Sequence, residues 1–265
     1  MRFALSTGSL YTYGLDRVFA LAAEAGFDGI EVLVDHRFDT RQPVYLRRLM
    51  ERHGLPILSV HAPFRPRRLA AWPKTQPESI AATAELARAV GAGVIIVHLP
   101  YGINRAYARW LRNDLRTWQQ AHPIPVIAVE NMPLKWFRWW PFAPLEMWRM
   151  NSLDVWGAFP HLTLDTTHLG TKGVDPLMVY ERVRERVAHV HLSNARREGR
   201  SVREHRRLED GFLPLDALIS RLAQDGYAGI ATVELHPDAL EAEDEEKTRF
   251  HLGQQIDFCR GGRNE

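Results

Sequence analysis

Eight short apolar runs, separated by stretches of helical periodicity, constrain the fold of this 265-residue chain more than any other feature. Most of the runs are nearly continuously hydrophobic and rich in β-branched residues, which is typical of strands covered on both faces. The stretches between them are amphipathic, as at 215–222, where leucine and isoleucine side chains share one helical face. The expected strands span residues 3–6, 29–34, 57–61, 93–98, 124–130, 162–165, 188–192 and 229–235.

This alternation predicts a closed (β/α)₈ barrel, or TIM barrel, that occupies residues 1–265 as a single domain. Barrels of this kind commonly have about 250 residues. A doubly wound sheet is the structural alternative. The sequence has no GxGxxG after the first strand and no Walker lysine loop, so the phosphate-binding fingerprints of that alternative are missing and the barrel is favoured.

Composition excludes several classes of protein. Apolar residues make up 45% of the chain and charged residues 25%, which excludes intrinsic disorder. No apolar run reaches the roughly 18 residues that a membrane span needs. The single Cys259 forms no internal disulfide, and residues 1–9 predict a strand rather than a signal peptide, so we expect a cytoplasmic protein. The net charge of +2 does not by itself indicate nucleic-acid binding.

Ionisable residues recur at the C-terminal ends of the expected strands. In a barrel these ends open onto one face, so residues far apart in the sequence converge there. A carboxylate or imidazole at the end of an apolar strand is costly to desolvate unless it is paired or bound to a metal. The residues at six consecutive strand ends are His61, His98, Glu130, Asp165, His191 and Glu234.

Four of these residues predict a divalent-metal site: Glu130, Asp165, His191 and Glu234. Their three carboxylates would repel one another without a cation, and mixed oxygen and nitrogen ligation suits Mn²⁺, Mg²⁺, Co²⁺ or Zn²⁺. Any one of the histidines taken alone fits a core or rim position equally well. Glu31 lies within the second strand, where it either pairs with an arginine across the barrel mouth or contacts a substrate.

The C-terminal third of the chain carries the most specific motifs. They are LDTTH, HVHLSNARREG, EHRRLEDGFLPLDALISRL and DGYAGIATVELHP, in that order. They are similar to the DxxH, the HxxD/N, the D-x-H-x-x-x-G-x-G stretch and the final glutamate of the xylose isomerase-like barrel superfamily. The chain resembles this superfamily over almost its whole length. Members include sugar isomerases, ketose 3-epimerases, inositol-catabolism enzymes and endonuclease IV, so the motifs are specific for the superfamily rather than for one reaction.

The resemblance implies an isomerase or epimerase of a sugar, a sugar phosphate or a related polyol derivative. Glu130, Asp165, His191 and Glu234 match the shared metal site. Glu130 and Glu234 also match a pair of acid/base carboxylates on opposite faces of the substrate. One carboxylate removes the α-proton, the metal stabilises the resulting enediolate, and the other carboxylate returns a proton. The expected substrate-binding residues are His61, His98, His168, His205, Arg197 and Glu31.

Two alternatives stay open. The same positions resemble endonuclease IV, which uses three zinc ions at abasic DNA; nucleic acid is a partner only in that case. The additional metal ligands would be His61, His98, His168 and His205. The departure from that family is Arg203, which stands where the family has an aspartate and cannot bind zinc, and the available substitute Glu204 is adjacent to His205. The second alternative is a barrel that binds metal and sugar without turnover.

Two further segments follow strands at the expected catalytic face. Residues 135–150 contain four tryptophans, two phenylalanines and three basic residues. We expect a lid, a stacking platform or a contact between copies of the chain there, unless the aromatic rings only pack on the barrel rim. Arg65, Arg67 and Arg68 follow the third strand and suit a phosphate or a sugar acid.

Overall fold

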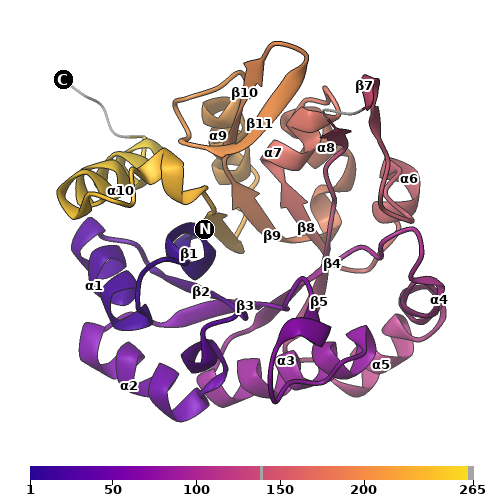
Figure 1. The fold of residues 1–265 in the computed structure, drawn as a ribbon, viewed down its shortest axis with the longest axis horizontal. Coiled ribbons are helices and arrows are strands. Elements are labelled where there is room, and N and C mark those ends of the chain that lie inside the picture. The colour runs from indigo at the N-terminus through magenta and orange to yellow at the C-terminus, as the bar shows by residue number, and fades with distance from the viewer. Residues whose placement is uncertain (138–139, 262–265) are drawn as a thin grey trace.

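The computed structural model describes residues 1–137 and 140–261, and no side chain between 136 and 144. Parallel strands close into a barrel in the order β1-β12-β9-β8-β5-β4-β3-β2, with helices around them (Figure 1), which confirms the predicted (β/α)₈ fold. The barrel strands are β1 Arg2–Ser6, β2 Gly29–Leu33, β3 Ile57–His61, β4 Val94–His98, β5 Val126–Glu130, β8 Leu162–Asp165, β9 Val187–Leu192 and β12 Ile230–Val233.

The strand bounds differ from the expected ones by small shifts at the ends, where backbone pairing rather than side-chain pattern decides. The shift matters at one place. β12 ends at Val233, so Glu234 is the first residue after the strand and not part of it. Its backbone N–H still donates to the carbonyl of Leu192, at 3.1 Å, which holds it against the end of β9.

Several helices begin or end where local signals predict. Gly26 and Gly91 end α1 and α3 in the left-handed conformation, with φ of 91° and 76°. Asp175 caps α8 by accepting a hydrogen bond from the backbone N–H of Leu177. In the described part of the chain, no helix combines the length and the apolar character needed to cross a bilayer. The helices are α1 Leu15–Ala25, α2 Pro43–His53, α3 Gln76–Val90, α4 Arg105–Asn113, α5 Leu115–Ala121, α6 Leu153–Trp156, α7 Thr166–Thr171, α8 Pro176–Val183, α9 Leu215–Gln224 and α10 Glu245–Cys259.

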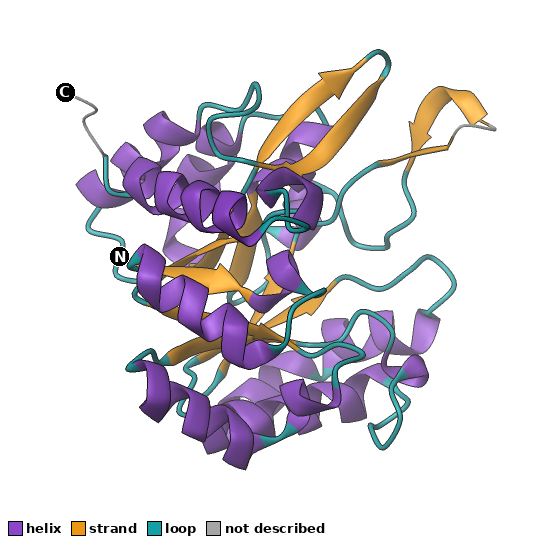
Figure 2. Ribbon diagram, turned by 60° about the vertical axis from the view of Figure 1, so that its left-hand side comes forward, coloured by secondary structure: helices purple, strands orange, loops and turns teal. Residues whose placement is uncertain are grey.

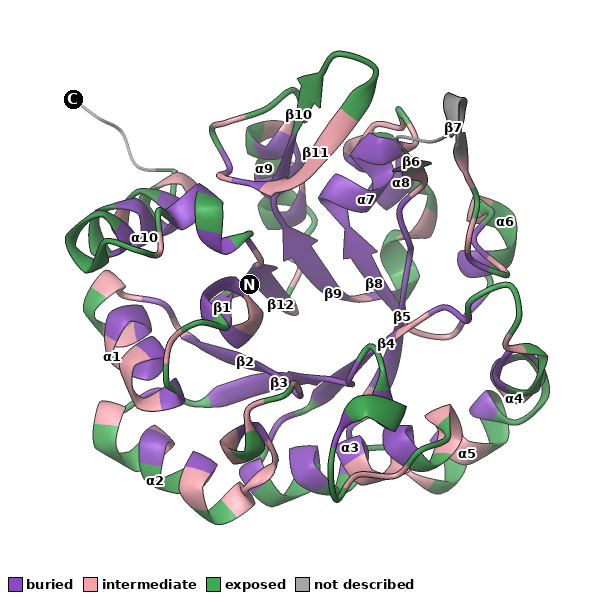
Figure 3. Cartoon of the chain, in the orientation of Figure 1, coloured by how far each residue is buried: buried purple, intermediate pink, exposed green. Residues whose placement is uncertain are grey.

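Two apolar clusters divide the interior. Figure 3 shows buried residues along the barrel strands and on parts of the surrounding helices. The larger cluster joins strand and helix residues and includes Leu5, Ile95 and Val129. A smaller cluster is formed by the alternate strand residues Ala4, Leu58, Val94, Ile96, Ala128 and Ile230. Because side chains alternate across a strand, this second set faces the barrel interior. His98 lies on the same interior face of β4, at the C-terminal end of the strand. The apolar centre of the barrel therefore borders directly on polar side chains at its C-terminal end.

Gly29 is required by close packing at the start of β2. A Cβ atom there would lie 2.4 Å from Leu58 Cγ and 2.7 Å from the Pro56 carbonyl oxygen. We expect Gly29→Ala to lower the free energy of unfolding by about 1–3 kcal/mol, as over-packed cores do, measured by urea denaturation. Gly253→Ala is the control, because nothing lies within 4 Å of its added Cβ and alanine favours the α10 helix. Equal stability of the two variants would contradict the packing argument.

Two antiparallel hairpins extend beyond the barrel (Figure 2). β6 (Lys135–Phe137) pairs with β7 (Trp140–Leu145), and β10 (Asn194–Glu198) pairs with β11 (Ser201–Arg206). The first hairpin is built from the aromatic segment 135–150. The lid, stacking and interface roles expected there depend largely on side chains at 136–144, which lie outside the described residues, and so does the expectation of an oligomer through this segment.

Candidate active site

A cavity of about 560 Å³ lies at the C-terminal ends of the strands, and we call it the inner cavity. The predicted site residues that line it are His98, Glu130, His168, His205 and Glu234. Aromatic side chains also line it, from Tyr11, Phe64, Tyr101 and Trp148. The barrel therefore brings side chains that are more than a hundred residues apart into one hollow of a size typical for small-molecule sites.

The four predicted metal ligands converge beside this cavity. Glu130, Asp165, His191 and Glu234 each offer one donor atom, and these atoms lie within 4.8 Å of one another. His191 Nδ1 is at the centre: it is 3.1 Å from Glu130 Oε1, 3.3 Å from Glu234 Oε2 and 3.7 Å from Asp165 Oδ2. The sequence pattern and the geometry thus point to the same four residues.

The chemistry of these four donors fits a divalent cation. Asp165 Oδ2 is buried and has no hydrogen-bond partner in the described part of the chain. Burial raises the pKa of Asp165. Burial by itself would lower the pKa of His191, but the surrounding carboxylates of Glu234, Glu31 and Glu130 raise it well above its usual value. Excess negative charge and an unpartnered oxygen are both satisfied by a metal, and the mixed ligand set suits Mn²⁺, Mg²⁺, Co²⁺ or Zn²⁺.

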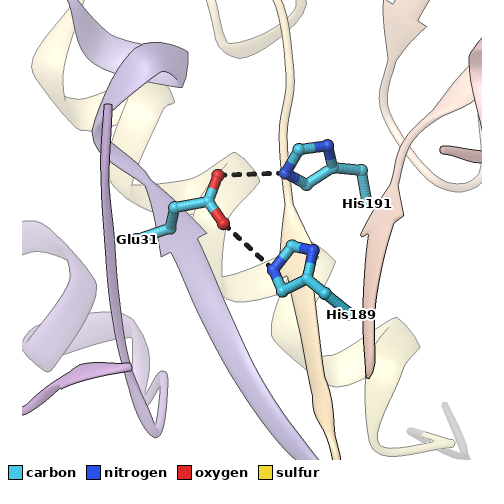
Figure 4. Close-up of side chains that lie close together, drawn as sticks. All are labelled: Glu31, His189 and His191. Carbon is cyan, nitrogen blue, oxygen red and sulfur yellow. Dashed lines mark hydrogen bonds and ion pairs between the residues drawn. The ribbon is translucent and has the colours of Figure 1, made fainter. Parts of the chain in front are cut away.

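Glu31 is held next to this cluster by a buried network (Figure 4). Its Oε1 is 3.0 Å from His191 Nε2, and its Oε2 is 3.0 Å from His189 Nε2. Ser59 also donates to Oε2, at 2.8 Å, and Thr232 donates at 3.3 Å. Burial opposes ionisation of Glu31, but His191 and His189 hold the pKa of this carboxyl well below its usual range.

This placement differs from the substrate contact or arginine pair that was expected for Glu31. The residue is fully buried, is not among the residues that line the inner cavity, and has histidines as its charged partners. Because a carboxylate only accepts, the Nε2 of His191 carries the hydrogen. Nδ1 faces Glu130 and Glu234, so it is the atom through which His191 would bind a metal in place of its second proton. A carboxylate that fixes a metal-binding histidine in this way is a common arrangement around metals.

Three other site histidines are oriented by the backbone. The Nδ1 atoms of His61, His168 and His205 lie 2.8, 2.9 and 3.1 Å from backbone carbonyl oxygens. A carbonyl oxygen only accepts, so each Nδ1 carries a hydrogen, and each neutral ring keeps its lone pair on Nε2. Burial lowers the pKa of His168 to about 4, so this ring is neutral at pH 7. His168 is therefore ready to bind a metal or to accept a hydrogen bond from a hydroxyl group.

Two further groups of candidate ligands adjoin the central four, and each shares one carboxylate with them. One group is His61, His98 and Glu130, and the other is Asp165, His168 and His205. In the first group, Nε2 of His98 and Nε2 of His61 lie 3.1 and 3.4 Å from Glu130 Oε2. The structure thus brings together the four central residues and the four additional metal ligands that the resemblance to endonuclease IV implies.

Arg203 stays outside these groups and pairs with exposed carboxylates. Its neighbour Glu204 lies closer to the site: one oxygen is 4.0 Å from His168 Nε2, and the other is 2.9 Å from Lys135 Nζ. His205 has a φ of 54°, which is uncommon for a residue other than glycine, and its ring centre is 5.4 Å from that of His168. Glu204 and His205 therefore both lie near His168.

Arg197, expected near the substrate, is not among the residues that line the inner cavity. It is exposed on β10, and its guanidinium lies 4.6 Å from the ring centre of Phe212. The hairpin turns this part of the chain outward. The expectation for Arg197 rested on its spacing from His191 in the sequence, which does not reveal the direction of the hairpin.

His189 is a site residue that the strand-end pattern does not single out. It precedes His191 by two residues on β9, so the two rings share the interior face. The HVH spacing is the signal that identifies it. Asn131 is a second such residue: its side chain exchanges hydrogen bonds of 3.0 and 2.8 Å with the backbone of Asp165, which fixes the C-terminal end of β8.

A family model described as a xylose isomerase-like TIM barrel matches residues 19–252. The chain belongs to this family. Among similar proteins, the uncharacterized protein ML2432 of Mycobacterium leprae (strain TN) is 26% identical over 276 residues, which covers 98% of this chain and 97% of the relative. The family model therefore covers most of this chain, and the relative matches it over nearly its whole length.

Solved structures of this fold include enzymes with different reactions. D-allulose 3-epimerase from Methylomonas sp., in complex with D-allulose, has a TM-score of 0.67 at 16% identity and covers 98% of this chain and 96% of its own. The AP endonuclease, family 2, from Brucella melitensis has a TM-score of 0.68 at 19% identity and covers 95% of this chain and 96% of its own. At these identities the likeness establishes the xylose isomerase-like fold, and the reaction has to be argued from the site.

Proposed function

We propose that this xylose isomerase-like barrel is a divalent-metal-dependent isomerase or epimerase of a sugar, a sugar phosphate or a related polyol derivative. The observation that supports it most is the convergence of Glu130, Asp165, His191 and Glu234, whose donor atoms lie within 4.8 Å of one another. This cluster adjoins a cavity with aromatic walls and several hydrogen-bonding side chains, which suits a polyhydroxylated ligand.

Glu130 and Glu234 act as the acid/base pair in this proposal. Both line the inner cavity, and β8 and β9 separate β5 from β12 around the closed barrel, so the two carboxylates approach from different sides. A substrate held between them presents one face to each. One carboxylate removes the proton from the carbon next to the carbonyl, and the other returns a proton to the opposite face. A bound divalent cation would polarise the carbonyl and the neighbouring hydroxyl, which acidifies that proton.

The surroundings of Glu130 keep its carboxyl group ionised. Burial favours its protonated form, but His191 and His98 hold the pKa of this carboxyl well below its usual range. Glu130 is therefore ionised at neutral pH and able to accept a proton. The neutral His168, fixed through its Nδ1–H, accepts a hydrogen bond from a substrate hydroxyl at Nε2 and so orients the sugar.

Exchange of the α-proton tests this function. The metal-loaded protein is incubated in D₂O with a panel of ketoses and aldoses, each with and without a terminal phosphate. We expect deuterium to enter the carbon next to the carbonyl of at least one compound, followed by NMR. Saturable binding of a sugar with no exchange would instead support a barrel that binds without turnover.

A metal-dependent phosphodiesterase acting on abasic DNA is the second candidate. The observation that favours it is the pair of additional ligand groups, His61–His98–Glu130 and Asp165–His168–His205. Arg203 stands where that family has an aspartate, and it pairs with Asp238 outside the Asp165–His168–His205 group. This argues against a full set of three zinc ions. Metal stoichiometry by mass spectrometry separates the two candidates: about one metal per chain favours the isomerase, and two or three tightly held zinc ions, with cleavage of an abasic duplex, favour the nuclease.

Removal of the metal is expected to destabilise the fold. Without a cation the clustered carboxylates repel one another, and a metal at a concentration of 100 times its Kd contributes about 2.7 kcal/mol to the free energy of unfolding. We expect dialysis against a chelator to lower the Tm and added metal to restore it. Asp165→Asn is the matched variant, because it keeps the shape of the side chain but removes a charged ligand. A Tm that does not respond to chelation or to added metal would contradict the metal site.

A further inference from the structure

A second cavity of about 570 Å³, which we call the outer cavity, adjoins the inner one. The residues that line both cavities are Phe64, Arg65, Arg68 and Tyr101. Phe64 stacks on the site histidine His98, with 4.5 Å between the ring centres. The outer cavity therefore begins directly beside the candidate active site.

The outer cavity is strongly basic. Four cationic side chains line it, from Arg65, Arg67, Arg68 and Lys74. Among the residues that the structure describes, no aspartate or glutamate lines it. The whole chain is almost balanced, with 34 basic and 32 acidic residues, so this concentration of positive charge is local. Cations gathered around one hollow repel one another, and a bound anion relieves that repulsion.

Two helices begin at the same place. Thr75 is the N-cap of α3 and Asn104 is the N-cap of α4, and both line the outer cavity. Their side chains accept from the backbone N–H groups of Glu78 and Tyr107, so both helix starts are already capped. The preference for an anion therefore rests on the four cationic side chains.

The two cavities favour different chemistry at the two ends of one ligand. The inner cavity has carboxylates and the candidate metal site, which suit a carbonyl group and its neighbouring hydroxyls. The charged side chains that line the outer cavity are all cationic. We infer that the substrate is a phosphorylated sugar whose reacting carbons lie in the inner cavity and whose phosphate is bound in the outer cavity by Arg65 and Arg68. The guanidinium group suits this role because its planar fork binds phosphate oxygens in pairs.

A small phosphorylated molecule fits better than a nucleic acid. The cations surround one hollow, where a single phosphate group can contact several of them at once. The sugar part of this inference rests on the proposed isomerase function. The anion site itself does not, because it is defined by the residues of the outer cavity.

Phosphate binding tests the anion site without knowledge of the sugar. Inorganic phosphate is titrated calorimetrically into the metal-loaded protein, its R65A/R68A variant and the control R116A, which removes an exposed arginine from α5. We expect saturable binding to the wild type and to R116A, weakened about tenfold or more in R65A/R68A. Binding of equal strength to all three proteins, or no saturable binding, would overturn the inference. Acetate bound as tightly as phosphate would overturn the assignment to phosphate in favour of a carboxylate.

Turnover separates this inference from the proposed function. Proton exchange is compared for D-fructose and D-fructose 6-phosphate and for the other matched pairs of the panel. We expect the phosphorylated member of the accepted pair to have the higher kcat/KM, by about tenfold or more. The R65A/R68A variant should lose this preference, and R116A should keep it.

Exchange without a preference for phosphate overturns the outer-cavity inference and leaves the isomerase function in place. Phosphate binding without any proton exchange supports the anion site in the outer cavity and overturns the isomerase function. An abasic duplex that binds more tightly than any sugar phosphate, and is released by R65A/R68A, overturns the small-molecule assignment.

Discussion

Replacing Glu234 by glutamine is expected to lower kcat by about 10²–10⁴-fold, the usual contribution of a positioned acid or base. Glutamine has nearly the shape of glutamate but cannot take up or return a proton at neutral pH. The side chain of Glu234 is 12% exposed and lines the inner cavity, whereas that of Glu130 is 1% exposed. The substitution at Glu234 should therefore leave the fold intact, as checked by circular dichroism and Tm.

Glu234 also belongs to the metal cluster, so loss of metal has to be separated from loss of proton transfer. Activity is measured at saturating metal, and bound metal is quantified for each variant. Glu198→Gln on the exposed hairpin is the matched control and should retain full activity. A Glu234→Gln variant that holds metal and retains near-full turnover would remove Glu234 from the catalytic pair.

Replacing Glu31 by glutamine is expected to weaken metal binding by about 10- to 100-fold, as loss of a supporting hydrogen-bond partner does at other metal sites. The amide of glutamine offers one acceptor atom in place of two, so it cannot accept from both His191 and His189. Even when the amide oxygen faces His191, a neutral amide is a weaker acceptor than a carboxylate, so the hydrogen is held less firmly on Nε2 and the lone pair less firmly on Nδ1. The readout is metal affinity by competition with a chromophoric chelator.

Ser59→Ala is the matched control for Glu31. It removes the hydroxyl that donates to Oε2 but leaves the contact between Oε1 and His191. We expect its metal affinity to change by less than about threefold, since the lost hydrogen bond does not involve His191. The absorption spectrum of the Co²⁺ form gives a second readout, because it changes when His191 is reoriented. Wild-type affinity and spectrum in Glu31→Gln would show that Glu31 has no role in orienting His191.

Much of the site follows from local sequence patterns. Nearly continuous hydrophobic runs place the strands, and an ionisable residue at the end of such a run has only the C-terminal mouth of a barrel to occupy. Asp165 and His191 are found in this way, because each ends or nearly ends its strand. Gly26 and Gly91 are found equally well, because a helix end is decided by the conformation of one residue.

The sequence by itself therefore determined the barrel and the set of residues at its mouth. The tertiary structure decided how those residues face one another. The partners Glu31 and His191 are 160 residues apart, and their contact depends on the register of the strands and on side-chain rotamers. The exposed position of Arg197 and the shared wall of Arg65 and Arg68 depend on the paths of a hairpin and a loop. The physical reason is that alternation and capping act within a few residues, whereas hydrogen-bond direction, charge balance and cavity shape arise only when distant segments pack together.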